Sequence, residues 1–234
     1  MDQFLDYLIR KSDRGNNEYF NYRPNKRNIA AENIMPRREN ETYENRERPK
    51  YTKITEPTAS SYVVIDFETT GMNCRINRII EIGAVKVSDG RVVGTFSTLI
   101  DPEQYIPGII SRKVHITNQM VKGKPRIEDM LPEFVDFIGD LPLVAHNASF
   151  DMGFLLASAE RAGISIENPA LDTVSLSRRY NKECARHNLA YLTEFFGIEL
   201  KNAHRAYFDA AATQKLYEII RKKYNDIQTE DQEK

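Results

Sequence analysis

The sequence is poor in cysteine, carries almost no net charge and contains no long apolar run. Cys74 and Cys184 are its two cysteines, and their wide spacing gives neither a disulfide framework nor a zinc-binding pattern. We therefore expect a protein of a reducing compartment, the cytoplasm. No apolar stretch approaches the roughly 18 residues of a membrane span. The start, MDQFLDYLIRKSDRG, carries acids early and lacks a small-residue cleavage site, so it does not have the form of a signal peptide. These absences predict no membrane association.

The net charge of −1 at pH 7 excludes the strongly basic field of a protein that wraps duplex nucleic acid. It leaves room for a small site that holds a few nucleotides. Hydrophobic residues make up 41% of the chain and charged residues 29%, which is ordinary for a globular protein. A length of 234 residues predicts one domain with a tail.

The first quarter of the chain differs in composition from the rest. The stretches NNEYFNYRPNKRN and RRENETYENRERPK are rich in Asn, Arg and Glu and poor in aliphatic residues. Such segments cannot bury enough apolar surface to offset the entropy lost on ordering, so we expect a disordered arm over residues 1–59. Apolar residues at helical spacing in DQFLDYLIRK leave two interpretations of residues 2–11: a short docking helix for a partner, or a frayed end.

From residue 60 onward the pattern predicts an α/β domain. The segments YVVIDF, RIIEIGAVKV and RVVGTFSTLI are rich in β-branched residues, and Asp89-Gly90 between the last two predicts a hairpin. LPLVAHN and ALD are the next predicted strands, and they alternate with helices. We expect a mixed central sheet of five strands, flanked by helices, over residues 60–225, followed by a charged tail over residues 226–234.

Helical spacing locates the segments that should cover this sheet. SRKVHITNQMVKG predicts a short helical connection, and RIEDMLPEFVDFIGD and NLAYLTEFFG predict helices. SFDMGFLLASAERAG predicts a helix with Ser149 as its N-cap and Gly163 as its stop. AYFDAAATQKLYEIIRKKY predicts the last and longest helix.

Two carboxylates interrupt the first predicted strand. Asp66 and Glu68 in YVVIDFETTG share one face of that strand because side chains alternate. Two like charges at a buried edge repel each other unless a cation compensates them, and oxygen ligands favour Mg²⁺ or Mn²⁺. A polar turn that caps the strand is the alternative interpretation of this pair taken alone.

A further acid follows the predicted strand LPLVAHN. Asp151 lies at the opening of a helix, where an acid is also favoured by the helix macrodipole alone. His146 and Asn147 stand at the end of the strand, where open α/β sheets place their ligands, although a structural His–Asn turn fits them equally well.

The third group is His204 and Asp209 in HRAYFDAAA, at the start of the last helix. Small residues around Asp209 let a helix pack closely on a sheet. An acid in such a stretch faces either water or a metal ion, and both interpretations remain open for this segment alone.

Taken in order, VIDFETTG, AHNASFD and HRAYFDA resemble the three motifs of the DnaQ-like, DEDDh class of 3′-to-5′ exonucleases. This class includes the epsilon subunit of DNA polymerase III and the exonuclease domain of PolC-type polymerases. The resemblance covers roughly residues 60 to 222 and implies a ribonuclease H-like fold.

The resemblance also implies the chemistry. It predicts two divalent ions, Mg²⁺ or Mn²⁺, held by the four carboxylates of Asp66, Glu68, Asp151 and Asp209. His204 would be the general base that takes a proton from the attacking water.

Substrate contacts are implied by the same resemblance. The family often has Gly where His115 stands here, so the loop that should separate the terminal bases can differ in shape. The matching positions are Phe67, Thr69, Thr70, Gly71, Ile116, Thr117, His146, Asn147 and Phe150.

The function implied is hydrolysis of phosphodiester bonds from the 3′ end of single-stranded DNA, in proofreading or repair, with release of nucleoside 5′-monophosphates. An exoribonuclease that trims RNA is the first alternative, and a catalytically inactive module that binds 3′ ends is the second. A DNA polymerase subunit or a sliding clamp is the expected partner, since residues 2–8, DQFLDYL, loosely resemble a clamp-binding peptide.

Overall fold

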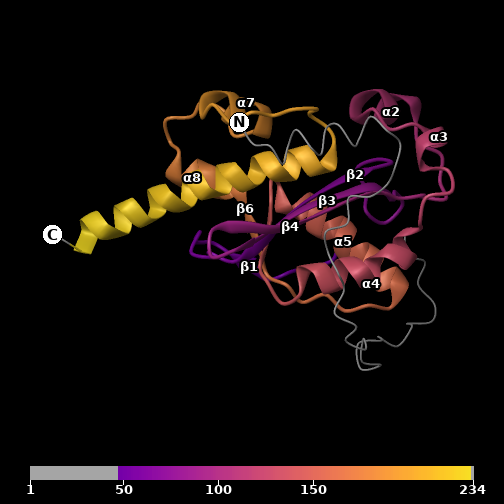
Figure 1. Ribbon diagram of the computed structural model, residues 1–234, viewed down its shortest axis with the longest axis horizontal. Coiled ribbons are helices and arrows are strands. Elements are labelled where there is room, and N and C mark those ends of the chain that lie inside the picture. Colours follow the sequence, from indigo (N-terminus) through magenta and orange to yellow (C-terminus); the bar gives the residue numbers. More distant parts are fainter. Residues whose placement is uncertain (1–46, 233–234) are drawn as a thin grey trace.

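A computed structural model describes residues 47–232 as a mixed sheet with helices on both faces (Figure 1). The predicted docking helix at residues 2–11, the clamp-binding peptide and most of the predicted disordered arm lie outside the described residues. The sheet order is β1-β6-β5-β2-β3-β4. Its strands are β1 Lys53–Ile54, β2 Tyr62–Thr69, β3 Ile79–Ser88, β4 Arg91–Leu99, β5 Leu143–Ala145 and β6 Ala170–Asp172.

The sheet combines an antiparallel meander with parallel crossovers. Strands β2, β3 and β4 pair antiparallel, whereas β5 pairs parallel with β2, and β6 pairs parallel with both β5 and β1. The hairpin between β3 and β4 turns at Asp89 and Gly90, both of which have positive φ, as a tight two-residue hairpin turn requires. The predicted α/β class, ribonuclease H-like topology and hairpin are confirmed.

Side chains of β2 alternate between two cores. Val63, Ile65 and Phe67 belong to one core, whereas Tyr62 and Val64 belong to the other. Because the period of a strand is two, Asp66 and Glu68 lie on the same face as Tyr62 and Val64.

Helices α4 and α5 cover the first face, and α6, α7 and α8 cover the second (Figure 1). Two short helices, α2 and α3, pack with β3 in a small third core. The helices are α2 Gly108–Val114, α3 Asn118–Val121, α4 Ile127–Ile138, α5 Ala148–Ala162, α6 Thr173–Tyr180, α7 Leu189–Phe195 and α8 Ala206–Gln232.

Three details differ from the expectations. The sheet has six strands and not five, because β1 adds two residues from the predicted arm beside β6. Helix α8 continues to Gln232, through most of the predicted tail, and its end projects beyond the sheet (Figure 1). Ser149 is not the N-cap of α5: the helix begins at Ala148 after Asn147.

Among the described residues, the helices are all too short or too polar to cross a membrane.

The start of α5 explains the error at Ser149. Asn147 has a left-handed backbone, with φ of 71°. The Asp172 carboxylate at the end of β6 accepts hydrogen bonds from the backbone N–H groups of Asn147 (3.0 Å) and Ala148 (3.3 Å). These first amide groups are therefore satisfied from a neighbouring strand, and a local side-chain cap is not needed. The predicted stop at Gly163 is confirmed as the C-cap.

Candidate active site

The candidate site lies where the end of β2 meets the start of α8. Asp66 and Glu68 are on the α8 face of β2, and their partners across the antiparallel pair with β3 are Gly83 and Glu81. Gly83 brings the helix close: a Cβ built there would stand 2.1 Å from the backbone carbonyl carbon of Ala206. The first turn of α8 therefore rests directly on the strand beside the two acids.

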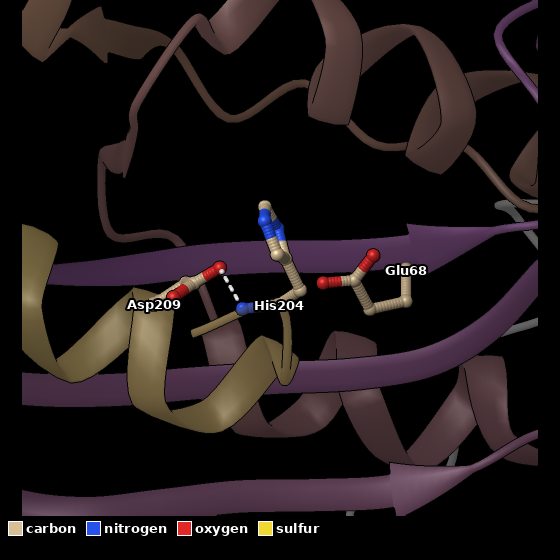
Figure 2. A group of neighbouring side chains, drawn as sticks. All are labelled: Glu68, His204 and Asp209. Carbon is tan, nitrogen blue, oxygen red and sulfur yellow. Dashed lines mark hydrogen bonds between the residues drawn. The ribbon is translucent and has the colours of Figure 1, made fainter. Parts of the chain in front are cut away.

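That close approach places His204 and Asp209 against Glu68. Asp209 Oδ2 accepts a hydrogen bond from the His204 backbone N–H at 3.1 Å, and His204 has a φ of 66°. One ligand atom from each of Glu68, His204 and Asp209 lies within 4.8 Å of the others. In Figure 2 the two carboxylates reach toward His204 from opposite sides. Three of the five predicted catalytic residues thus form one group.

Asp151 enters from the opposite side of β2. It lies in the first turn of α5 with 2% of its surface exposed. Its Oδ1 accepts a hydrogen bond at 3.1 Å from the backbone N–H of Phe67, the residue between Asp66 and Glu68. The bond ties the second predicted motif to the first, although Asp66 and Asp151 are not part of the 4.8 Å group.

The carboxylates raise one another's affinity for protons. Burial and the charge of Asp151 raise the pKa of Asp66 well above its usual value, with Asp209 and Glu68 adding to the effect. Burial and the charge of Asp209 raise the pKa of Glu68 to about 8. Burial raises the pKa of Asp151 as well. Four acids with this mutual repulsion form a site that favours the binding of cations.

Asp209 also has the properties of a residue that binds a cation. Burial raises the pKa of its carboxyl to about 6, against the hydrogen bond from His204 that lowers it. Its Oδ1 atom is buried and has no hydrogen-bond partner among the described residues. A buried carboxylate oxygen is normally satisfied, so this atom is well suited to a metal ion. Carboxylate oxygens are the ligands that Mg²⁺ and Mn²⁺ prefer, so the four acids fit either ion.

His204 and His146 both have a lowered pKa, which favours their neutral form. The pKa of His204 is lowered by partial burial and by the charges of Lys113 and His115 from the end of α2. Burial lowers the pKa of His146 to about 4, and its Nδ1 lies 2.9 Å from the Thr173 hydroxyl. A neutral imidazole can accept a proton, as a general base must.

The predicted substrate residues fall into three groups. Thr69 and Thr70 are buried at the end of β2, where the Thr69 hydroxyl donates to the Gly71 carbonyl at 2.6 Å and the Thr70 hydroxyl contacts Gln104 at 2.5 Å. These contacts fix the shape of the turn that leads away from the acids, at Gly71.

A second group lies after strand β5 and at the starts of helices α5 and α3. His146 and Phe150 are partly buried, Asn147 is exposed, and Thr117 is exposed and caps α3 by accepting from Met120 N–H.

Phe67 and Ile116 differ from expectation. Phe67 is buried against Phe134, with ring centroids 6.0 Å apart, and Ile116 is fully buried in the core between α2, α3 and β3. Odd-numbered residues of β2 face the α4–α5 core, so Phe67 points away from the acids. In this structure neither side chain is presented to a ligand.

Glu81 and Arg205 are the site residues that the sequence reasoning missed. Glu81 is buried on the α8 face of β3, beside Glu68, and both its oxygens bind Arg205. A signal was present, since Glu81 is a charge inside the apolar run RIIEIGAV and Arg205 directly follows His204.

Comparison with known proteins agrees with this geometry. The family model RNase_T, described as an exonuclease, matches residues 63–217. A DNA polymerase III PolC-type protein of Clostridium perfringens is 43% identical over 165 residues, which are 70% of this chain and 11% of that protein. A PolC-type protein of Halalkalibacterium halodurans is 44% identical over 158 residues, 67% of this chain and 11% of that protein. The chain thus spans about a tenth of the length of these relatives.

Solved structures point the same way. Exonuclease X in complex with 5′-overhanging duplex DNA is 30% identical, with a TM-score of 0.55, and the match covers 68% of this chain and 90% of that one. E. coli exonuclease I in complex with a dT13 oligonucleotide shares the fold at 18% identity, with a TM-score of 0.62 over 72% of this chain and 42% of that one. The motifs, the sheet and these matches lead to one conclusion: the chain belongs to the RNase_T exonuclease family, among the DnaQ-like 3′-to-5′ exonucleases that its three motifs predict.

Proposed function

We propose that the chain removes nucleotides from the 3′ end of single-stranded DNA and releases nucleoside 5′-monophosphates. The observation that carries the proposal is the group of Glu68, His204 and Asp209, whose ligand atoms lie within 4.8 Å of one another at the end of β2. An acidic cluster of this kind holds a phosphodiester only together with cations, and the relatives supply the nuclease context.

The proposed metal site uses the four acids. Asp66 would hold both ions, Glu68 and Asp209 would complete the site beside the attacking water, and Asp151 would support the other. When bound, divalent ions in such sites make water more acidic and stabilise the leaving oxygen. The raised pKa values of Asp66 and Glu68 and the unpartnered Oδ1 of Asp209 support this assignment.

His204 would act as the general base. It takes a proton from the attacking water while the water oxygen bonds to phosphorus and the bond from phosphorus to the 3′ oxygen of the preceding nucleotide breaks. The lowered pKa of His204 leaves the ring unprotonated near neutral pH, as this role requires. Its exposure lets a substrate reach the ring.

A role in proofreading is supported by the relatives, which are PolC-type DNA polymerase III proteins. The chain covers about a tenth of their length, and a replicative DNA polymerase is the partner that we propose for it. Co-purification of the chain with a replicative polymerase, at salt near the physiological level, tests that part of the proposal.

The decisive experiment is digestion of 5′-labelled single-stranded DNA and RNA of the same sequence with Mg²⁺, Mn²⁺ or EDTA. We expect a ladder that shortens from the 3′ end of the DNA and that EDTA abolishes. Asp209→Asn should abolish the ladder, whereas Asp140→Asn, an exposed acid before β5 at the opposite end of the sheet, should leave it unchanged. A ladder on RNA alone would keep the mechanism and overturn the substrate, and digestion in EDTA would overturn the metal site.

A further inference from the structure

An ion pair between the buried Glu81 and the partly exposed Arg205 joins β3 to the residue that precedes α8. Glu81 has 2% of its surface exposed. Arg205 Nε donates to its two carboxylate oxygens at 3.0 and 3.2 Å, and Arg205 Nη2 donates to Oε1 at 2.7 Å. The backbone N–H of Ala206 donates to Oε2 at 3.0 Å. One carboxylate thus binds both a side chain and the first amide group of α8.

The pair lies beside the proposed metal site, next to residues from both β2 and the segment before α8. Glu81 lies directly across from Glu68 in the β2–β3 register, and Arg205 is the next residue after His204. Gly83, two residues along the same face of β3, lets the backbone of Ala206 touch the strand. The approach of the His204–Asp209 segment to Glu68 is therefore set at Glu81 and Gly83.

The charge of Glu81 has a clear electrostatic cost at this place. It contributes to the raised pKa values of Asp66, Glu68 and Asp209. Further along the same face, Val85 and Val87 are buried apolar residues in the core shared with α8. An ion pair that buries a carboxylate seldom stabilises a fold more than apolar residues of the same size would. A gain in stability therefore does not explain the acid at position 81. Its bonds to Arg205 and Ala206, which fix the start of α8, are the better explanation.

We propose that Glu81 and Arg205 are positioning residues of the exonuclease site. Their forked ion pair holds His204 and Asp209 at a fixed distance from Glu68, and the guanidinium offsets the fifth negative charge near the cluster. The inference rests on the proposed function. It adds that the alignment of the general base depends on a pair of residues that touch neither substrate nor metal.

Kinetics of three variants test the pair as a unit: Glu81→Gln, Arg205→Gln and the double variant. Displacement of a catalytic group by about 1 Å can lower the rate about 10²-fold. We expect each single variant to lower kcat by about that factor with little change in KM. The double variant should lose no more than a single one, because residues that act together are not additive. Losses that multiply in the double variant, or single variants with unchanged kcat, would overturn the proposal.

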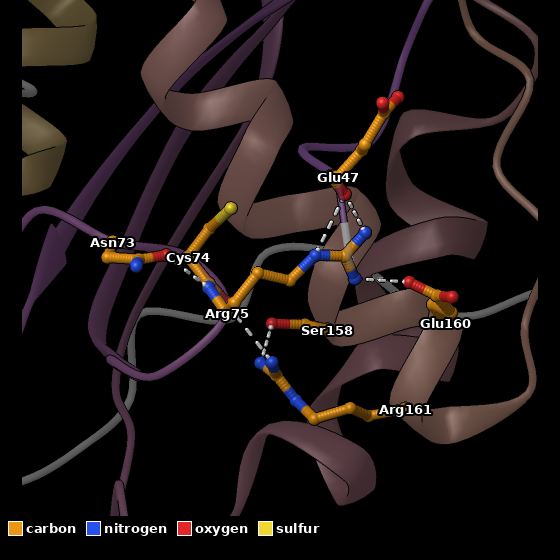
Figure 3. Close-up of polar contacts among 7 residues, drawn as sticks. All are labelled: Glu47, Asn73, Cys74, Arg75, Ser158, Glu160 and Arg161. Atoms are coloured by element: carbon orange, nitrogen blue, oxygen red, sulfur yellow. Dashed lines mark hydrogen bonds and ion pairs between the residues drawn. The ribbon is translucent and has the colours of Figure 1, made fainter. Parts of the chain in front are cut away.

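Arg205→Lys is the conservative variant, and Glu160→Gln is the matched control. Arg205→Lys keeps the charge and should restore part of the kcat that Arg205→Gln loses. Glu160 also forms an ion pair with an arginine, the buried Arg75, at 2.5 Å, but this pair joins α5 to the loop after β2 (Figure 3). Glu160→Gln should leave kcat unchanged, and an equal loss there would overturn a specific role for Glu81.

Hydrogen exchange supplies a readout that does not need activity. We expect the backbone amides of residues 203–209 to exchange about tenfold faster in Glu81→Gln than in the wild type, with no such change in Glu160→Gln. If Glu81→Gln does not fold, the two Arg205 variants carry the same comparison. A wild type without metal-dependent hydrolysis would refute the proposed function and leave this readout valid. An active wild type with unchanged exchange in the variants would refute only the positioning role.

Discussion

The two faces of strand β2 carry opposite kinds of residue. On the face toward α8, Asp66 and Glu68 repel each other and depend on neighbours to offset their charge. On the face toward α4, Phe67 packs into an aromatic cluster in which Phe134 lies 5.1 Å from Phe96 between ring centroids. Adjacent residues of one strand thus serve the site and the core in turn. Residues that serve catalysis and residues that stabilise the core are therefore immediate neighbours along β2.

The comparison predicts its largest effect on activity at Asp66. Asp66→Asn should reduce hydrolysis to background, because the acid that interacts with all the other carboxylates is lost. The same change should make the metal-free protein more stable, since the raised pKa of Asp66 shows that the neutral form is favoured in the fold. Urea unfolding in EDTA, beside the labelled-DNA assay, measures both. Measurable hydrolysis at saturating Mn²⁺ would contradict the assignment.

The next-largest loss of activity is expected at His204. His204→Gln should lower kcat by about 10²–10⁴-fold, the usual contribution of a general base. Metal affinity, measured by titration calorimetry with Mn²⁺, should change little. If affinity collapsed while kcat at saturating metal stayed near the wild-type value, His204 would be a ligand, which its place in the 4.8 Å group also permits.

The opposite face should give the opposite result. Phe134→Ala should lower the free energy of unfolding by about 3–5 kcal/mol, because a fully buried ring is removed from the aromatic cluster. The kcat of the molecules that remain folded at low temperature should be close to that of the wild type. A loss of kcat comparable to that of His204→Gln would show that the two faces are not independent.

The smallest effect concerns pH. Glu68 has a pKa raised to about 8 in the folded chain, so its contribution to stability is present below the unfolded value of about 4.3 and is lost as pH rises toward 8. The metal-free protein should therefore lose stability as pH rises from about 6.5 to about 8, and saturating Mg²⁺ should reduce that loss. His146, with a lowered pKa, acts in the other direction only below about pH 6.5. Stability in EDTA that rises across this window would contradict the assignment.

Features that depend on local spacing could be predicted from the sequence. The alternation in YVVIDFET placed Asp66 and Glu68 together on one face, and Asp89-Gly90 located the hairpin. Features that depend on distant partners could not. The two residues of β1 are a strand only because they pair with β6, and the start of α5 is capped by Asp172 from another strand.

The site shows the same limit. Burial of Ile116 depends on the packing of α2 and α3 against β3, which periodicity does not reveal. Glu81 and Arg205 are separated by 124 positions, and a single sequence holds no signal that joins them. Their roles could be assigned only when the register of β2 and β3 was known.

The contact at Gly83 also sets how this protein can change over evolutionary time. A core side chain can be exchanged for another of similar size, but at position 83 the obstacle is the backbone of Ala206 and Tyr207, which no neighbouring substitution can trim. Any replacement would push the start of α8, and His204 and Asp209 with it, away from Glu68. In a complete substitution library selected for exonuclease activity, this glycine should tolerate fewer alternatives than the phenylalanines of the core, although it contributes no chemical group to the reaction.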